Sequence, residues 1–582
     1  MKSNLFWRFR LIHIALTLAG VAIVVQIIHI LYSPEAETIR AYGKTYSGQI
    51  WEFSPARGEI YDRKGQLLAG NKTMYETGVD LTADPDANEV AIAAQIYLGL
   101  DYGMVFNAIT QPPGGIVYVV LDKFTPGDKV QAFEDFRETV KGTTTAENLA
   151  AVYFQPHLER TYPENSLAAN MLGFVDRNKW AYYGIEEKYN TLLAGTTITR
   201  WVPVNPNDAQ SIPDVPPGAT LILTIDREIQ AATEEILDNA LNIYGADSGV
   251  IVVADPKTGE ILAMASTPRL NPNEYWTYME TFPGETPYNR AVSQAYEPGS
   301  VVKILTMAAA IDKGVVRPET IYDDRTGTFE VGGITIYNWD HAAWGPQDMI
   351  GCLQHSLNVC LAWVATQLGQ QDFYAYMQNF GLGHVTGIDL AAENPGRLKL
   401  PQDSDWYPVD LGTNAFGQGV SITPIQMVMA ATAIANNGQM VRPHVLKATV
   451  QNGVQRDLPV EVIGSPISAA TAQTMNWMLS ISLENESSLS LVPGYSIAGK
   501  TGTAQIPTEN GYTIEKTNAS FIGWGPVDDP KFLVYVWLEK PQTSIWGSET
   551  AAPVFKQVVQ KLVVLMGIPP DQVRLSLTSG GR

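Results

Sequence analysis

Positive charge is scarce in this chain of 582 residues, because 39 Lys and Arg stand against 60 Asp and Glu and the formal net charge is −21. Nucleic-acid binding depends on clustered cations that contact phosphates, so we do not expect a general nucleic-acid-binding protein. The sequence also lacks a fixed-period repeat and a low-complexity tract, and its composition excludes collagen-like, coiled-coil and disordered chains. Its length and its 45% hydrophobic content leave room for two or three domains with sizeable cores.

Cysteine is almost absent, and the only two, Cys352 and Cys360, lie in residues 352–360 (CLQHSLNVC), a stretch that predicts helix. In a continuous helix their Cα atoms would be roughly 12 Å apart, which is too far for a disulfide. Cys352, His355 and Cys360 are an alternative set of metal ligands, but a fourth ligand is missing and helical spacing spreads the three over different faces. We therefore predict two buried thiols that pack as small hydrophobic residues, and no metal site.

Long hydrophobic runs are limited to one clear case, residues 11–32 (LIHIALTLAGVAIVVQIIHILY), which carry no formal charge. The run is long enough to cross roughly 30 Å of hydrocarbon. Basic residues precede it and acidic residues follow it, so the positive-inside rule predicts a cytoplasmic N-terminus with the remainder of the chain outside. A cleaved signal peptide is the alternative, but the apolar run is long and no A-x-A-like site follows it. We predict a single uncleaved transmembrane helix.

Proline and glycine mark the main domain boundary. Residues 201–218 contain five prolines and cannot hold a regular helix, so they predict a linker or an extended arm. The region before this linker is mixed, with a strand-like stretch at 115–121 and a helix-like stretch at 165–173. The predicted divisions are a cytoplasmic tail at 1–10, a transmembrane anchor at 11–32, a mixed α/β pedestal domain at 33–217, a second domain at 218–570 and a tail at 571–582.

The second domain predicts an α+β fold with an antiparallel sheet. Residues 220–225 (TLILTI) are apolar and β-branched like a strand, and Asp226 is a good N-cap for an amphipathic helix at 227–241. Residues 249–265 read as a hairpin, because two apolar strands flank the turn sequence DPKTG. Further candidate elements are strands near 519–525 and 531–538 and a last helix near 552–566.

A serine and a lysine with helical spacing are the first candidates for chemistry. Pro298 and Gly299 precede an apolar run and so mark a helix start, which places Ser300 in the first turn, where free backbone N–H groups can stabilise an oxyanion. Lys303 lies one turn further on the same face, within reach of the Ser300 hydroxyl. Apolar neighbours are consistent with a lysine whose pKa is low enough for a general base. The alternative is an N-cap serine with a solvated lysine.

Two further motifs follow in the same domain. Ser356 and Asn358 form the only S-x-N in the chain, and on a helix or tight turn they can relay a proton and orient a substrate amide. Residues 500–503 (KTGT) lie in an extended stretch where Gly502 allows a bound peptide to approach the backbone and add a strand. A second Lys-Thr-Gly at 257–259 lies in the predicted hairpin turn before Ser300 and is a decoy. The order S-x-x-K, S-x-N, K-T-G is the one that penicillin-interacting serine acyltransferases require.

The chain resembles the class B penicillin-binding proteins, which are monofunctional peptidoglycan transpeptidases. Residues 57–69 (RGEIYDRKGQLLA) resemble the motif R-G-x-I-x-D-R-x-G-x-x-L-A that follows the membrane anchor in this class. The resemblance runs from the anchor to the last helix, although residues 71–159 carry the family pattern poorly. Its other matches are 160–163 (RTYP), 172–175 (LGFV), 184–187 (GIEE), 416–419 (FGQG) and 423–426 (TPIQ).

The resemblance implies a penicillin-binding transpeptidase fold, in which an antiparallel sheet is flanked by helices and joined by a mostly helical subdomain, after a transmembrane helix and an elongated pedestal. It also implies a mechanism. Ser300, deprotonated by Lys303, attacks the carbonyl between two terminal D-alanines of a stem peptide, and the backbone N–H groups of Ser300 and Thr503 form the oxyanion hole. Ser356 then passes a proton to the departing D-alanine, and Asn358 holds the donor peptide.

The remaining roles follow from the same resemblance. Lys500 and the hydroxyls of Thr501 and Thr503 hold the terminal carboxylate of the donor, beside Gly502. An amine of a second stem peptide resolves the acyl-enzyme, and β-lactams acylate Ser300 as mimics of the donor terminus. No metal or organic cofactor is implied. The implied partners are a polytopic membrane glycosyltransferase of the shape, elongation, division and sporulation family and other division or elongation proteins.

Several residues keep more than one interpretation. Arg57, Asp62 and Arg63 are expected to form a buried ion-pair network in the pedestal rather than a catalytic group. Trp524 and Trp546 line the substrate groove or pack in the core. Glu393 lies at a distance along the chain from Asn358 similar to that of the deacylating glutamate of class A β-lactamases, although we interpret its segment as a loop. His355 is expected to pack or face solvent rather than act as a base.

A division role is slightly favoured over an elongation role for a bacterial cytoplasmic-membrane enzyme with its catalytic domain outside. Two other activities stay open. In a carboxypeptidase or β-lactamase, water rather than an amine would resolve the acyl-enzyme. A non-catalytic scaffold or β-lactam sensor would bind through the same groove without turnover.

Overall fold

The computed structural model describes residues 4–33, 36, 38, 48–203, 215–486, 488–508 and 511–579, so residues 204–214 of the predicted linker lie outside the described residues. The chain forms two compact units, one of residues 1–56 with 194–218 and one of 57–193 with 219–582. In the first unit, β1 (Gly48–Phe53) pairs antiparallel with β8 (Ile198–Pro203). The domain boundary at 217/218 stays a prediction.

The first unit also contains α1 (Asn4–Leu31), the helix formed by the apolar N-terminal run. Residues 6–31 of this helix have a mean hydropathy of 2.5, and none of its most apolar window is buried against other parts of the chain. It is therefore long and apolar enough to cross a membrane. The helix begins before residue 11, where we predicted the start of the span, because the preceding residues continue the helical backbone without a breaker.

The second unit is organised around a five-stranded antiparallel sheet with the strand order β11-β10-β24-β23-β22. The predicted hairpin forms its first two strands, and the DPKTG sequence makes the turn between them. The strands predicted near the C-terminus are also confirmed. Their bounds are β10 Ser248–Ala254, β11 Ile261–Ser266, β22 Ala498–Thr508, β23 Gly511–Gly525 and β24 Phe532–Glu539.

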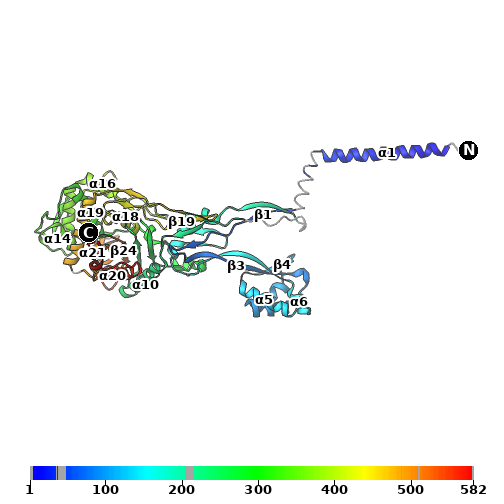
Figure 1. Cartoon of the computed structure of the whole chain (residues 1–582), viewed down its shortest axis with the longest axis horizontal. Coiled ribbons are helices and arrows are strands. Elements are labelled where there is room, and N and C mark those ends of the chain that lie inside the picture. Colours follow the sequence, from blue (N-terminus) through cyan, green and yellow to red (C-terminus); the bar gives the residue numbers. More distant parts are fainter. Residues whose placement is uncertain are drawn as a thin grey trace. The chain divides into compact units, whose positions relative to one another are not determined.

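Helices cover both faces of this sheet, so its central strands are apolar throughout rather than alternating. In β10, Val250 and Val252 pack into one core, whereas Ile251 and Val253 pack into the other, as the two-residue repeat of a strand requires. On the second face α10 (Arg227–Tyr244) and α20 (Ala551–Leu565) lie side by side (Figure 1), with α10 on β10 and β11 and α20 on β23 and β24. The first face is covered by α18 (Pro424–Ala435) and α19 (Ala469–Asn485), and α13 (Lys303–Lys313) packs against these two helices.

A second sheet joins the pedestal region to the strand that follows the linker. Its strand order is β20-β19-β9-β2-β3-β4, with β5 also paired to β3, and β2 runs parallel to β9. The strand predicted at 220–225 is thus confirmed as β9, but its partner comes from the pedestal region. Their bounds are β2 Ile60–Tyr61, β3 Leu67–Asp80, β4 Tyr118–Pro126, β5 Val152–Thr161, β9 Thr220–Leu223, β19 Leu446–Gln451 and β20 Val454–Asp457.

Buried charges in the pedestal region pair differently from the prediction. The carboxylate of Glu186 is fully buried and accepts hydrogen bonds from Arg57 and Arg160, each at 2.6 Å. Asp62 is also buried and accepts backbone N–H groups, including that of Arg227 at the start of α10. Arg63 pairs with Glu260, which directly precedes β11, at 3.2 Å. Arg57, Asp62 and Arg63 therefore anchor separate contacts rather than one shared network, because each faces a different segment.

The other elements surround these sheets. Asp226 caps α10 through the N–H groups of Glu228 and Ile229, as predicted. The predicted helix at 165–173 forms only in its last part, as α7. The strand predicted at 115–121 is observed as β4, which begins and ends later in the chain. Residues 571–579 of the predicted tail form a helix. In the pedestal region the bounds are η1 Leu81–Ala83, α3 Ala87–Ala93, η2 Ala94–Leu98, α4 Tyr102–Thr110, α5 Gly127–Thr139, α6 Thr144–Leu149, α7 Ala169–Leu172, β6 Phe174–Val175, β7 Ala181–Tyr182, α8 Gly184–Lys188 and α9 Asn190–Ala194.

After the linker, short helices and two-stranded ribbons form a mostly helical subdomain beside the sheet. The bounds there are η4 Pro272–Thr277, α11 Tyr278–Thr281, α12 Arg290–Ser293, η5 Gly299–Val302, β12 Tyr322–Asp324, β13 Thr328–Val331, β14 Ile334–Tyr337, β15 Gly345–Gln347, α14 Met349–Gln354, α15 Asn358–Leu368, α16 Gln370–Asn379, β16 Arg397–Leu398, α17 Asp410–Asn414, β17 Val420–Ser421, β18 Met440–Val441, β21 Val462–Gly464 and α21 Asp571–Ser579.

Candidate active site

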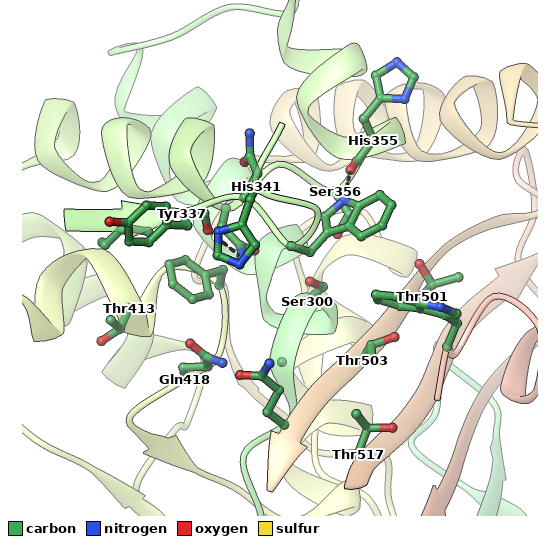
Figure 2. A pocket seen from close by; sticks show the side chains of 18 of the residues that line it. Ser300, Tyr337, His341, His355, Ser356, Thr413, Gln418, Thr501, Thr503 and Thr517 are labelled. Carbon is green, nitrogen blue, oxygen red and sulfur yellow. Dashed lines mark hydrogen bonds between the residues drawn. The ribbon is translucent and has the colours of Figure 1, made fainter. Parts of the chain in front are cut away.

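A cavity of about 630 Å³ brings the three motifs of the second domain together. Figure 2 shows the Ser300 side chain between the turn that carries Ser356 and the strand that carries Thr501 and Thr503. Lys303 and Lys500 are buried beside this cavity, with 0% and 3% of their surfaces exposed. The predicted residues that line the cavity are Ser300, Ser356, Asn358, Thr501 and Thr503.

Ser300 lies in the 3₁₀ turn η5, which leads directly into α13 with Lys303 as its first residue. The prediction of a helix start is confirmed. Gly299 has a φ of 62°, and a Cβ added there would lie 2.9 Å from the carbonyl oxygen of Thr503. Only glycine allows this close approach without strain, so the residue before the serine lets η5 pack directly on β22.

The Lys303 amine is held by the S-x-N motif. Its Nζ atom lies 2.6 Å from the Ser356 carbonyl oxygen, 3.1 Å from Ser356 Oγ and 2.8 Å from Asn358 Oδ1. Burial, and then the positive charge of Lys500, lower the pKa of Lys303 well below its usual value. The hydrogen-bond partners of the amine are these three oxygens. The Ser300 hydroxyl is not among its partners within the described residues. A neutral amine keeps a lone pair and can serve as a base.

The S-x-N motif lies at a break between two helices rather than on one. α14 ends at Gln354, α15 begins at Asn358, and Ser356 between them has a φ of 52°. The continuous helix that we predicted through residues 352–360 is therefore wrong. The Trp339 indole N–H donates to the His355 carbonyl oxygen at 3.1 Å, a long-range contact at the break that local propensity does not contain.

This break also overturns the prediction for the cysteines. Cys352 and Cys360 form a disulfide, with their Cα atoms 6.1 Å apart instead of the roughly 12 Å of a straight helix. Both residues are buried, as expected, but they are not free thiols. The disulfide also removes both sulfurs from the alternative set of metal ligands.

The Lys-Thr-Gly motif occupies β22, an edge strand of the five-stranded sheet. Gly502 pairs with Ser520 on β23, and a Cβ added at Gly502 would lie 2.2 Å from Ser520 Oγ. Thr503 Oγ1 accepts a hydrogen bond from the Gly547 N–H at 3.0 Å. Lys500 Nζ donates to Thr501 Oγ1 at 3.1 Å, and burial lowers the pKa of Lys500 to about 8. The strand thus presents hydroxyls to the cavity above a lysine that is charged near neutral pH.

We expect the second-order rate constant for acylation by a penicillin to fall as the pH rises through about 8. Lys500 is protonated below its pKa of about 8 and neutral above it, so its attraction for the penicillin carboxylate is lost on the alkaline side. A hydrogen bond to a charged group contributes roughly 1.5–3 kcal/mol, which corresponds to a loss of about tenfold or more. Stopped-flow acylation from pH 6 to 10 measures this profile. The methyl ester of the same penicillin has no carboxylate, so its profile should lack the fall; a fall shared by the ester contradicts the role of Lys500.

Residues that we did not predict form much of the cavity wall. The largest group comes from the segment 334–344, whose aromatic and histidine side chains (YNWDHAAW) were the available signal. Trp339 packs edge-on against Trp546 with ring centroids 5.1 Å apart, so Trp546 lines the cavity. Trp524 is instead fully buried and donates its indole N–H to Asn476. Further lining residues are Tyr337, His341, Trp344, Thr413, Gln418, Glu486, Thr517 and Glu549.

Two ambiguous features lie outside this cavity. Glu393 accepts hydrogen bonds from the Thr386 and Gly387 N–H groups, at 2.6 and 3.1 Å, and lines a different hollow. It therefore stabilises a loop. Lys257 of the decoy motif pairs with Asp529 at the hairpin turn.

His355 lines the cavity but stacks on Trp344 with ring centroids 4.3 Å apart, and burial lowers the pKa of its imidazole.

An antiparallel sheet between helical layers, with a serine, two buried lysines and an S-x-N turn at its edge strand, defines the class of serine acyl-transfer enzymes. Residues 249–560 match the penicillin-binding protein transpeptidase domain, and residues 52–211 match the penicillin-binding protein dimerisation domain. The chain belongs to the class B penicillin-binding proteins.

Curated relatives agree along most of the chain. Stage V sporulation protein D of Bacillus subtilis is 31% identical over 532 residues, which cover 89% of this chain and 79% of the relative. Peptidoglycan D,D-transpeptidase FtsI of Escherichia coli is 27% identical over 565 residues, covering 93% and 88%.

Solved structures share the same fold. Penicillin-binding protein 2X of Streptococcus thermophilus superposes with a TM-score of 0.75 at 23% identity, covering 89% of this chain and 80% of that one. Penicillin-binding protein 3 of Mycobacterium tuberculosis in complex with ampicillin has a TM-score of 0.68 at 26% identity, covering 89% and 97%.

Proposed function

We propose that this protein is a peptidoglycan D,D-transpeptidase, which cross-links two stem peptides through an ester on Ser300. The observation that carries the proposal is the fully buried Lys303 amine beside the cavity, with a lowered pKa and the S-x-N oxygens around it. A neutral lysine at this place can accept the serine proton, whereas a solvated lysine at neutral pH cannot. The names of the relatives, which include a D,D-transpeptidase and a protein solved in complex with ampicillin, support the same chemistry.

In the first half-reaction the donor stem peptide lies along β22 as an added strand. Ser300 Oγ forms a bond to the carbonyl carbon of the penultimate D-alanine, and the backbone N–H groups of Ser300 and Thr503 stabilise the oxyanion. The serine proton passes to Lys303 and, through Ser356, to the nitrogen of the terminal D-alanine. The C–N bond then breaks and free D-alanine leaves.

In the second half-reaction an amine of a neighbouring stem peptide attacks the ester carbon. The amine loses one proton, the C–O bond to Ser300 breaks, and the serine oxygen regains a proton. During the first half-reaction Asn358 orients the donor peptide, while Lys500, Thr501 and Thr503 hold its terminal carboxylate beside Gly502 until free D-alanine leaves. A β-lactam follows only the first half-reaction, because its leaving nitrogen stays tethered to the acyl group.

The same proposal places the catalytic part outside the bacterial cytoplasmic membrane. The apolar helix α1 supplies a single span, and basic residues before residue 11 favour a cytoplasmic N-terminus. The Cys352–Cys360 disulfide supports this orientation, since disulfides persist in oxidising compartments. We propose a polytopic membrane glycosyltransferase of the shape, elongation, division and sporulation family as partner, and a role in division with elongation as the alternative.

A hydrolytic function, in which water attacks the acyl-enzyme, is the second candidate. The glutamate that spacing alone suggested, Glu393, is bound by loop N–H groups away from Ser300. Glu393 is therefore not placed to activate water at Ser300, and product analysis separates attack by an amine from attack by water. A non-catalytic scaffold would not need a buried base beside its serine.

Product analysis with the full-length protein in detergent tests this proposal. The protein is incubated with a pentapeptide donor that ends in D-Ala-D-Ala and with a stem-peptide amine acceptor, and products are separated by liquid chromatography with mass detection. We expect a cross-linked dimer together with an equal amount of released D-alanine. Protein already acylated with penicillin is the control and should form neither.

The other outcomes contradict the proposal in distinct ways. Release of D-alanine with only the shortened donor as product identifies a carboxypeptidase. Rapid consumption of the penicillin used in the control identifies a β-lactamase. Binding of donor without any product, in protein that also takes no penicillin label, identifies a sensor or scaffold.

A further inference from the structure

The disulfide encloses one of the proposed catalytic motifs. Cys352 lies in α14 and Cys360 lies in α15, and the segment between them carries both Ser356 and Asn358. Both cysteines are fully buried, so the cross-link is internal to the fold. The covalent ring therefore contains the turn that contacts the Lys303 amine.

The cross-link is compatible with a broken helix but not with a straight one. In a continuous helix the two Cα atoms would be roughly 12 Å apart, whereas a disulfide requires roughly 4.4–6.8 Å. The observed distance is 6.1 Å. The break strains the backbone, because Ser356 takes a left-handed φ of 52°, which residues other than glycine and asparagine disfavour. Within the turn the Leu357 N–H bonds the Cys352 carbonyl oxygen at 3.0 Å.

The break decides where the Ser356 carbonyl points. In a straight α-helix this oxygen would accept the N–H group four residues later, which belongs to Cys360 itself. In the broken form the same oxygen accepts Lys303 Nζ at 2.6 Å, and Asn358 Oδ1 accepts it at 2.8 Å. A segment that straightens into helix would withdraw these acceptors from the amine.

We propose that the Cys352–Cys360 disulfide is a positioning element for acylation, because it excludes the straight helix and keeps the S-x-N turn on Lys303. This inference rests on the proposed function, namely acylation of Ser300 with Lys303 as base. Contacts from outside the ring also hold the turn: Trp339 bonds the His355 carbonyl, and Asn338 accepts the Val359 N–H at 3.3 Å. Loss of the disulfide should therefore loosen the turn without unfolding the domain.

The test compares oxidised full-length protein in detergent with the same protein after reduction by a phosphine, and with the double variant Cys352→Ala/Cys360→Ala. Acylation by a fluorescent penicillin is measured over a range of drug concentrations, which separates the rate at saturation from the half-saturation concentration. We expect reduction to lower the saturated rate about tenfold and to change the half-saturation concentration less than twofold, since a small displacement of a catalytic group affects the bond-forming step most. The double variant should match the reduced protein and should not respond to the phosphine, and reoxidation should restore the wild-type rate.

Alkylation under denaturing conditions, followed by intact-mass analysis, establishes how many thiols each sample carries. An unchanged saturated rate in protein with two alkylated thiols overturns the positioning role while leaving the proposed function in place. The positioning role is also overturned if reduction slows the saturated rate, weakens penicillin binding and lowers the thermal midpoint together, because such a result indicates that the whole domain has loosened. Two thiols in the unreduced protein overturn the cross-link itself. Oxidised protein that takes no label refutes the proposed function, and the positioning role with it.

Discussion

The Ser300→Ala variant is expected to take up no penicillin, with a loss of labelling of at least about 10³-fold against the wild type. The methyl group cannot form the ester. Of the other hydroxyls that line the cavity, that of Ser356 is already 3.1 Å from the Lys303 amine, on the opposite side of the cavity from β22. Intact-mass analysis of the full-length protein after exposure to the drug gives the adduct directly. Because Ser300 is only half-buried, the thermal midpoint of the variant should differ little from that of the wild type.

Ser293→Ala is the matched control for this experiment. Ser293 lies a short distance before Ser300, and its hydroxyl donates to the Ala392 carbonyl oxygen at 2.8 Å outside the cavity. Its labelling should equal that of the wild type. A full adduct on Ser300→Ala would mean that another residue is the nucleophile, and peptide mapping of that adduct would identify it.

Lys303→Met is expected to slow acylation by about 10²–10⁴-fold, the usual contribution of a positioned general base. Methionine has nearly the volume of lysine without its amine, so the cavity keeps its shape but the serine keeps its proton. The variant should also lose the acidic limb of the pH–rate profile, because that limb reports deprotonation of Lys303 in the free enzyme. Raising the pH should not restore its rate. Acylation kinetics between pH 5 and 9 measure both effects.

The same change has a structural cost that must be separated from catalysis. It leaves the Ser356 carbonyl and Asn358 Oδ1 without their donor, which costs about 1–3 kcal/mol for each buried acceptor that water does not reach. Thermal unfolding measures this loss. Lys257→Met in the decoy motif removes an exposed ion pair with Asp529 and should change neither acylation nor its pH dependence. A Lys303→Met rate within tenfold of the wild type, with the acidic limb intact, would leave Lys303 a purely structural role.

Local sequence determined much of the second domain because the signals there are local in physical origin. The DPKTG turn with two apolar flanks specified the β10–β11 hairpin, since turn chemistry and strand propensity act over neighbouring residues. Asp226 caps α10 because an N-cap needs only the next turn of backbone. The order of the three motifs also indicated which of two Lys-Thr-Gly sequences belongs to the cavity. In the pedestal, short helices and edge strands left weaker patterns, so the expected segments at 115–121 and 165–173 were only partly right.

Tertiary structure decided the features that depend on partners far along the chain. Residues 352–360 have the composition of one helix. The observed break is held by hydrogen bonds from the Trp339 indole and the buried Lys303 amine, and by the disulfide within the segment. Which tryptophan lines the cavity was likewise settled by packing, because Trp546 meets Trp339 whereas Trp524 finds a buried acceptor. The sequence by itself determined the family, the order of the motifs and the main strands of the sheet. Only the fold placed a desolvated lysine among three oxygens, since desolvation and hydrogen-bond geometry are properties of residues brought together from separate segments.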